Sequence, residues 1–227
     1  MVYQKNEGII LHTIKYGEYD QILSVFTREE GLIKMIFRGA YAKKRAIGAS
    51  TAPFTQSEFV YERRQSSLFV CHETALINAH LSLRKSLACI DAAYLLAKIL
   101  LTSQAEQKSS PLLYDLFVCY LTRIPLSLSP AALVASFQMK FLRHEGLFGF
   151  TPHCSLCKAD LKDHFIARGE SFCEGDRPAE AMKLTPFEAE SLFILAFSKS
   201  YELIEQSALG GDLKAKIEWI FDTQVSM

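Results

Sequence analysis

GLIKMIFRGAYAKKRAIGASTAPF, residues 31–54, changes halfway along its length from an alternating apolar pattern to a basic segment of small residues. In the first half, apolar side chains alternate with a set that is largely basic, which predicts a half-buried strand over Leu32–Arg38. Gly39 ends this alternation, and Lys43-Lys44-Arg45 follow in a segment rich in Gly, Ala and Ser. The stretch therefore predicts a strand that runs into a basic loop.

A strand and a basic loop in this order suit the groove of a polyanion-binding protein, because the strand fixes some charges and the loop supplies adaptable ones. Between Gly31 and Arg64 there are seven Lys or Arg residues and two acids. A solvated strand face beside an ordinary loop is the alternative interpretation, since basic runs are often simply hydrated. The candidate DNA-contacting residues are Lys34, Arg38, Lys43, Lys44 and Arg45, with Arg28, Arg63 and Arg64 as a second group.

Five short apolar segments, separated by turn residues, occupy the first 80 residues and leave little room for helices between them. Such a pattern predicts a small barrel or sandwich. The long connection after the third segment favours an OB-type barrel, whose exposed face and loops often bind single strands. The predicted strands are Glu7–Ile14, Gln21–Thr27, Leu32–Arg38, Thr55–Glu62 and Leu68–His72.

The same region carries an ordered series of short motifs. LHT is followed by YGEYD, then by the turn FTREEGL, then by RGA and a basic loop that ends in Gly-Ala and Pro-Phe. Over about 45 residues this series resembles the N-terminus of the bacterial recombination-mediator family RecO. The resemblance implies an OB-fold that binds DNA, an α-helical domain and a zinc module.

Function and partners also follow from the resemblance as expectations. It implies binding to single- and double-stranded DNA, annealing of complementary strands, and loading of recombinase onto strands coated by single-strand-binding protein. RecR and the acidic C-terminal tail of single-strand-binding protein are the implied protein partners. A base beside an apolar surface would suit that tail, and Arg123, Lys140 and Arg143 are the candidates.

Helical periodicity begins after Leu81 and continues to the end of the chain. Leu83–Leu101 is apolar on more than one side, which indicates a central helix of a bundle. Ser110-Pro111 and Ser129-Pro130 are start signals for two more helices, with Ser as N-cap and Pro in the first turn. Thr185–Glu188 reads as a capping box that begins a helix extending to about Glu205, and Gly210-Gly211-Asp212 precedes a last helix.

Three cysteines lie close together in the last third of the chain. Cys154 and Cys157 form a C-x-x-C pair, and Cys173 follows after fifteen residues. Thiolates at such a spacing suit a structural zinc site, whereas a redox motif is disfavoured because Cys154 does not open a helix after a strand. The other cysteines, Cys71, Cys89 and Cys119, stand among apolar residues and are expected to be core groups.

Members of the RecO family commonly carry a second C-x-x-C pair, but Asp176 stands here at the fourth position. A carboxylate can ligate zinc, and His153 or His164 could also complete the tetrahedron. We expect structural zinc on Cys154, Cys157 and Cys173 with Asp176 as the fourth-ligand candidate. A metal-free module held by packing is the alternative.

Charge and composition limit the function classes. The net charge is zero, but residues 1–80 carry +2, residues 81–150 carry +3 and residues 151–227 carry −5, so a polyanion is expected on the N-terminal side. Neither a signal peptide nor a transmembrane span is visible, and six cysteines without a secretory signal fit a reducing compartment. We therefore expect a cytoplasmic protein, and the resemblance to the RecO family implies association with the nucleoid.

The sequence thus predicts an α+β protein: an OB-fold DNA-binding domain over residues 1–80, then an α-helical domain over 81–227 with a zinc-finger-like module at about 151–178. No nucleophile–base set, phosphate loop or dinucleotide motif is present, which favours a mediator over an enzyme. Two alternatives stay open. One is a protein-binding adaptor whose barrel no longer binds DNA, and the other is a nuclease-like metal enzyme that uses Asp and His near the cysteines.

Overall fold

The computed structural model describes residues 3–41, 50–63, 68–207 and 209–225. It divides into two compact units, Met1–Leu126 and Ser127–Met227. In the part of the chain that the structure describes, no helix is both long enough and apolar enough to cross a bilayer.

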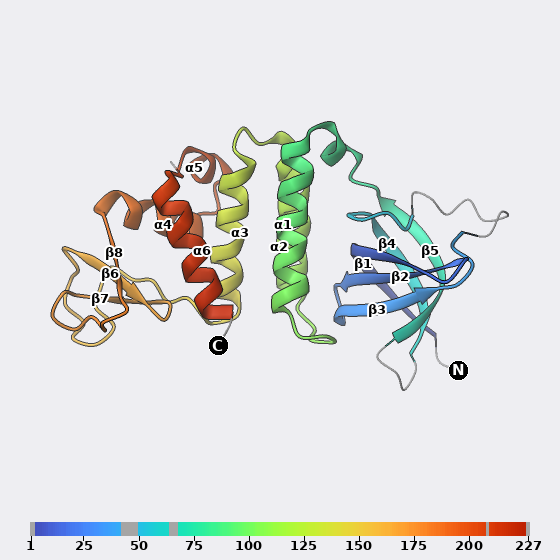
Figure 1. The fold of residues 1–227 in the computed structure, drawn as a ribbon, viewed down its shortest axis with the longest axis horizontal. Coiled ribbons are helices and arrows are strands. Elements are labelled where there is room, and N and C mark those ends of the chain that lie inside the picture. The colour runs from blue at the N-terminus through green and yellow to red at the C-terminus, as the bar shows by residue number, and fades with distance from the viewer. Residues whose placement is uncertain (1–2, 42–49, 64–67, 208, 226–227) are drawn as a thin grey trace. The chain divides into compact units, whose positions relative to one another are not determined.

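The first unit begins with a closed five-stranded barrel in the order β1-β2-β3-β5-β4, with β4 pairing back onto β1 (Figure 1). β3 and β5 run parallel, and every other neighbouring pair is antiparallel. The predicted five-stranded OB-type barrel is therefore confirmed. The strands are β1 (Tyr3–Tyr16), β2 (Asp20–Thr27), β3 (Gly31–Phe37), β4 (Gln56–Glu62) and β5 (Leu68–Asn78).

The alternation of apolar and basic side chains in the first half of residues 31–54 determines which face of β3 is buried. Ile33, Met35 and Phe37 are buried in the barrel core, while Lys34 is exposed. Ile36 departs from the expected open face, because it too is buried. The outer face of β3 is therefore less open to solvent than the simple two-face pattern indicates.

Two helices follow the barrel within the first unit, each with a short 3-10 turn at one end. Ser86 caps the first helix by accepting a hydrogen bond from the backbone N–H of Cys89, and the second packs its rings of Tyr114 and Phe117 against Phe26 of β2. The elements are η1 (Leu81–Lys85), α1 (Leu87–Ser103), α2 (Pro111–Arg123) and η2 (Ile124–Leu126).

The second unit holds four helices and a small three-stranded sheet in the order β7-β6-β8 (Figure 1). α3 packs against the other three helices, and Ser136 on α3 donates a hydrogen bond to the carbonyl of Leu195 at 2.6 Å. The elements are α3 (Pro130–His144), β6 (His164–Ala167), β7 (Glu170–Phe172), β8 (Met182–Leu184), α4 (Pro186–Phe197), α5 (Tyr201–Gln206) and α6 (Gly211–Val225).

The predicted helix boundaries hold in part. Ser110 and Ser129 occupy N-cap positions before Pro, but neither side chain accepts a capping hydrogen bond. The single helix expected from Thr185 to about Glu205 is wrong, because the chain breaks into α4 and α5. Ser198 takes an extended backbone and Ser200 caps α5, since serine side chains compete with helix hydrogen bonding.

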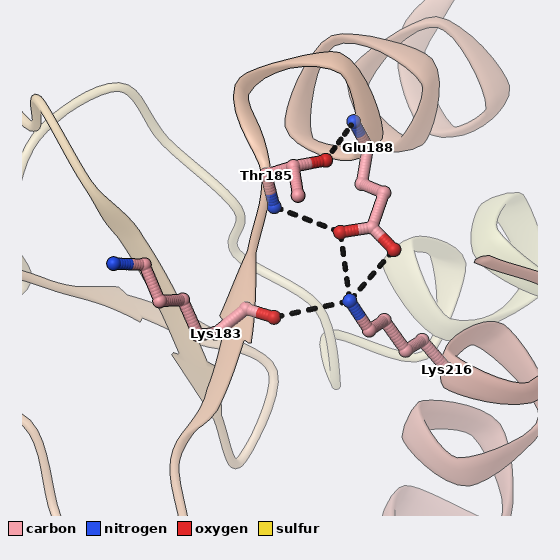
Figure 2. Close-up of polar contacts among 4 residues, drawn as sticks. All are labelled: Lys183, Thr185, Glu188 and Lys216. Atoms are coloured by element: carbon pink, nitrogen blue, oxygen red, sulfur yellow. Dashed lines mark hydrogen bonds and ion pairs between the residues drawn. The ribbon is translucent and has the colours of Figure 1, made fainter. Parts of the chain in front are cut away.

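The capping box at the start of α4 is formed as the sequence predicts. The side chain of Thr185 accepts from the backbone N–H of Glu188, and the Glu188 carboxylate accepts from the backbone N–H of Thr185 (Figure 2). Lys216 of α6 donates to both oxygens of Glu188, at 2.6 and 2.7 Å, and to the carbonyl of Lys183 in β8. The ammonium group of Lys216 therefore joins α6 to both α4 and β8.

Candidate nucleic-acid surface and metal centre

The basic residues predicted to contact DNA fall into two sets. Lys34 lies on β3, Arg28 in the β2–β3 turn, Arg63 just after β4, and Arg38 just after β3, where it is exposed. Lys43, Lys44, Arg45 and Arg64 lie outside the residues that the structure describes.

Three of the described bases each have a carboxylate partner. Lys34 Nζ lies 2.5 Å from Oε1 of Glu106, and Arg28 Nη2 lies 2.8 Å from Oδ2 of Asp115 on α2. Arg63 is 3.6 Å from Glu30, and its guanidinium also covers the ring of Phe69. The Lys34 and Arg28 pairs are exposed on both sides and contribute about 0–1 kcal/mol each, so a phosphate could exchange with either carboxylate at little cost.

The segment between α1 and α2 places Glu106 on the barrel. Gln107 donates its backbone N–H to the carbonyl of Leu32 at 2.9 Å, and Glu106 forms a parallel bridge with Leu32. Gly31 permits this approach, because a Cβ there would lie 1.9 Å from the carbonyl oxygen of Lys108 and its φ is +69°.

The sequence reasoning missed this segment as part of the surface. Gln107 also accepts a hydrogen bond from Arg63, so Lys34 and Arg63 meet the same short segment. The acids lie 72 and 87 residues away from Lys34 and Arg28, and no local pattern connects them. The one available signal was Gly31, which marks a turn but does not identify the segment that packs against it.

Four side chains in the second unit form the candidate metal centre. The ligand atoms of Cys154, Cys157, Cys173 and Asp176 all lie within 4.8 Å of one another. Asp176 Oδ2 is 3.4 Å from the sulfur of Cys154 and 3.2 Å from that of Cys173, and the sulfurs of Cys157 and Cys173 are 3.8 Å apart. Ligand atoms around a tetrahedral zinc are separated by about 3.5–3.8 Å, given bonds near 2.0–2.3 Å.

Local backbone geometry positions these ligands. Cys154 is buried, its N–H donates to the carbonyl of Ala159, and its carbonyl accepts from Lys158, whose φ of 63° turns the chain back. Cys173 follows directly on β7, and Asp176 lies in the turn after it. The knuckle and the β-hairpin thus aim two pairs of donors at one point.

The electrostatics of the cluster favour a cation. Hydrogen bonds from the thiols of Cys157, Cys173 and Cys154 hold the pKa of Asp176 below its ordinary value. The Asp176 carboxylate in turn raises the pKa of Cys157 to about 12. Burial acts to raise the pKa of Cys154, but backbone N–H groups, that of Cys173 foremost, more than offset it and lower that pKa. The cluster could hold a metal ion that replaces the thiol protons.

The two histidines considered as fourth ligands are placed differently. His153 pairs through Nδ1 with Asp160 at 2.8 Å, and the ring of His164 lies against Phe150. Among the described residues, the group of four ligands contains neither histidine. The structure therefore brings Asp176, and not a histidine, to the three thiols.

Comparison with known proteins covers both units. A family model described as "Recombination protein O N terminal" matches residues 1–80, and one described as "Recombination protein O C terminal" matches residues 85–216. The chain is 27% identical over 218 residues to "DNA repair protein RecO" of Chlamydia pneumoniae, covering 95% of this chain and 86% of that one. The protein of the same name from Bacillus subtilis (strain 168) is 30% identical over 169 residues, with 74% and 66% covered.

Proposed function

Because the chain belongs to the recombination protein O family of DNA repair proteins, we propose that its barrel binds single- and double-stranded DNA and that the protein anneals complementary strands. The observation that carries this proposal is the closed OB-type barrel, which leads from the exposed Lys34 on β3 through Arg38 into the basic segment Lys43–Arg45. Five-stranded barrels of this type often bind single strands.

Annealing requires no bond cleavage, so a basic surface is sufficient for it. Lys and Arg side chains screen two phosphate backbones while leaving the base edges free to pair. Release of condensed counterions supplies much of the binding free energy, which makes binding salt-dependent and independent of sequence. The protein therefore acts as a mediator and not as a catalyst of bond chemistry.

The ion pairs of the barrel fit a binding surface that exchanges partners. When DNA binds, phosphates replace Glu106 at Lys34 and Asp115 at Arg28. Each exchange substitutes one anion for another, so the desolvation cost is small. The main phosphate contacts are Lys34, Arg38, Lys43, Lys44 and Arg45, with Arg28, Arg63 and Arg64 in support.

We also propose that the cluster of Cys154, Cys157, Cys173 and Asp176 holds zinc in a structural role. Three soft thiolates with one carboxylate form a donor set that suits zinc. The metal would join the C-x-x-C knuckle to the turn after β7, which otherwise share a small core around Phe165 and Phe172.

The protein partners follow from the family. We propose RecR and the C-terminal tail of single-strand-binding protein as partners, with the chain loading recombinase onto coated strands in the cytoplasm, at the nucleoid. We place the division between the DNA-binding domain (residues 1–80) and the helical domain (residues 81–227) near residue 80, where one family match ends and the next begins shortly after.

A protein-binding adaptor is the second candidate, and the paired state of Lys34, Arg28 and Arg63 is the observation that favours it. If these pairs were permanent, the barrel would present little free charge to DNA. The feature that would mark an adaptor, pairing of Lys43–Arg45 with acids of the C-terminal third, falls outside the described residues.

Titration of labelled single- and double-stranded oligonucleotides across a range of salt separates the two candidates. A mediator binds both, with log K falling linearly as log salt rises, and discriminates among unrelated sequences by less than about a hundredfold, or ~2.7 kcal/mol. An adaptor shows no salt-dependent binding to either.

A further inference from the structure

A hollow of about 140 Å³ lies within the first unit, where the end of the β3–β4 connection meets η1 and α1. Phe54, His80, Arg84 and Tyr94 are among the residues that line it. Pockets for drug-sized ligands measure roughly 300–1,000 Å³, so this one is limited to a single flat ring system. Nothing in the proposed DNA surface uses it.

The aromatic wall is held in a fixed position by the backbone. Phe54 has a φ of +67°, which is rare for a residue with a bulky side chain. Its N–H donates to the carbonyl of Ile10 at 2.7 Å, and the next residue, Thr55, accepts from Ile10 N–H, so β1 fixes this conformation. The Phe54 ring then meets Tyr94 edge-on, with centroids 4.8 Å apart, while Tyr94 stays 47% exposed.

A second strained residue contributes the polar wall. His80 has a φ of 43° and is 5% exposed, and its backbone N–H is held by the side chain of Asn78. Its Nε2 atom is buried and has no hydrogen-bond partner among the described residues. Buried polar atoms are nearly always paired, and strained residues gather at binding sites, so both features suit a binding site. Burial also lowers the pKa of His80, which keeps the ring neutral and able to pair with a neutral ligand.

Arg84 adds a positive charge to the lining of the hollow. Arg84 is exposed and, within the described part of the chain, has no carboxylate partner, in contrast to Lys34, Arg28 and Arg63. These groups match the three parts of a nucleotide. The aromatic ring suits the face of a base, the unpaired imidazole suits the edge of a base, and the guanidinium without a carboxylate partner suits a phosphate.

We propose that this hollow binds one unstacked nucleobase, which stacks on Tyr94 and pairs with His80 while its phosphate contacts Arg84. This rests on the proposed DNA-binding function and deepens it, because it adds a base-recognising position to a surface that otherwise contacts phosphate. The base could belong to a single strand or to a free nucleotide, and the experiment has one arm for each source.

The first arm compares two labelled strands of about 15 nucleotides, a thymidine strand and a fully abasic strand with the same phosphates. The full-length chain is expected to bind the thymidine strand about 5- to 100-fold more tightly. Tyr94→Ala removes most of that preference and leaves affinity for the abasic strand unchanged. Leu95→Ala is the matched control, because Leu95 is the next residue of α1 and is 48% exposed, and it keeps the preference.

The outcomes separate this inference from the function on which it rests. Equal binding of both strands by the unmodified chain overturns the base site while DNA binding stands. A preference that survives Tyr94→Ala also overturns it. Failure to bind either strand overturns the proposed function and the site together.

The second arm uses thymidine and thymidine monophosphate as probes and follows the ring nitrogen resonances of His80 by NMR. If the site binds free nucleotides, thymidine monophosphate shifts the His80 resonances at a lower concentration than thymidine does. That difference in concentration is lost in Arg84→Gln and kept in the control variant Lys85→Gln. A shift produced only by the oligonucleotide supports the site and assigns it to strands. Unchanged His80 resonances with every probe, at concentrations where the strand is bound, overturn the proposal.

Discussion

Lys34 of β3 and Glu106 of the α1–α2 segment form an ion pair of 2.5 Å across 72 residues of sequence. The pair places the carboxylate of Glu106 beside β3, the strand that we propose as part of the DNA surface. It therefore makes Glu106 a competitor of phosphate for Lys34, and removing its charge gives the first prediction.

Glu106→Gln should strengthen binding to single-stranded DNA by about twofold to fivefold, because an exposed ion pair contributes no more than about 1 kcal/mol. The slope of log K against log salt should also become steeper, by up to about one counterion, as Lys34 becomes free for phosphate. Glu73→Gln on β5 removes an acid of the same barrel that forms no ion pair with a base among the residues that the structure describes. If both variants change affinity equally, the effect is one of net charge and not of competition.

The basic segment that follows β3 gives the second prediction. Charge reversal at Lys43, Lys44 and Arg45 together should weaken DNA binding and flatten its salt dependence, because fewer counterions are released. Far-UV circular dichroism and urea unfolding would establish that the barrel persists in the variant. Affinity and salt slope that both match those of the unmodified chain would exclude this segment from the surface.

The metal centre gives the third prediction. Protein purified without chelator should contain about one zinc per chain, and Cys154→Ser should lose it, because a thiolate ligand is removed. Acid should release the metal, since protons compete for the thiolates. Cys119→Ser is the control, because Cys119 lies on α2 outside the cluster. Protein without zinc that keeps full stability in chelator would favour the metal-free alternative.

Asp176→Ala then tests the fourth ligand separately. The three thiols should retain zinc more weakly, with an increased rate of loss to a competing chelator, because the carboxylate no longer completes the tetrahedron. Zinc affinity equal to that of the unmodified chain would assign the fourth position to another group, such as His153, His164 or water.

Much of this architecture could be predicted from local pattern. Alternation over Ile33, Met35 and Phe37 identifies the inner face of β3, and the capping box at Thr185 and Glu188 forms as its spacing indicates. The three thiols and Asp176 come together because their short knuckle and turn are determined by nearby residues.

The features that could not be predicted from the sequence depend on contacts between residues that lie far apart in the chain. The partners of Lys34 and Arg28 come from distant segments, and Lys216 reaches Glu188 from another helix. The break at Ser198–Ser200 was missed because apolar residues continue at helical spacing on both sides of it. The positive φ angles of Phe54 and His80 could not be predicted from the sequence, since neither residue type adopts positive φ often enough to indicate a strained backbone.

The junction of α4 and α6 gives the fifth prediction. Burial acts to raise the pKa of Glu188, but hydrogen bonds from Lys216 and Thr185 outweigh it and hold that pKa below its ordinary value. A depressed pKa in the folded state means that the contribution to stability is present above the ordinary pKa of about 4.3. That contribution is lost as the pH falls through the folded-state pKa.

Glu188→Gln should therefore lower the free energy of unfolding by about 1–2 kcal/mol at neutral pH, because the charge-assisted bonds to Lys216 are weakened. The difference from the unmodified chain should shrink on acidification. Urea unfolding at several pH values would measure it, with the exposed Glu190→Gln on the same helix as the control. A difference that stays constant with pH would show that the carboxylate charge is not responsible.

Strand annealing with and without single-strand-binding protein is the decisive assay of the proposed mediator activity. We predict that the full-length chain accelerates pairing of complementary oligonucleotides, that the acceleration persists when both strands are coated by single-strand-binding protein, and that reversal of Lys43, Lys44 and Arg45 abolishes it. If folded protein leaves pairing at the uncatalysed rate on both bare and coated strands, the protein is not an annealing mediator.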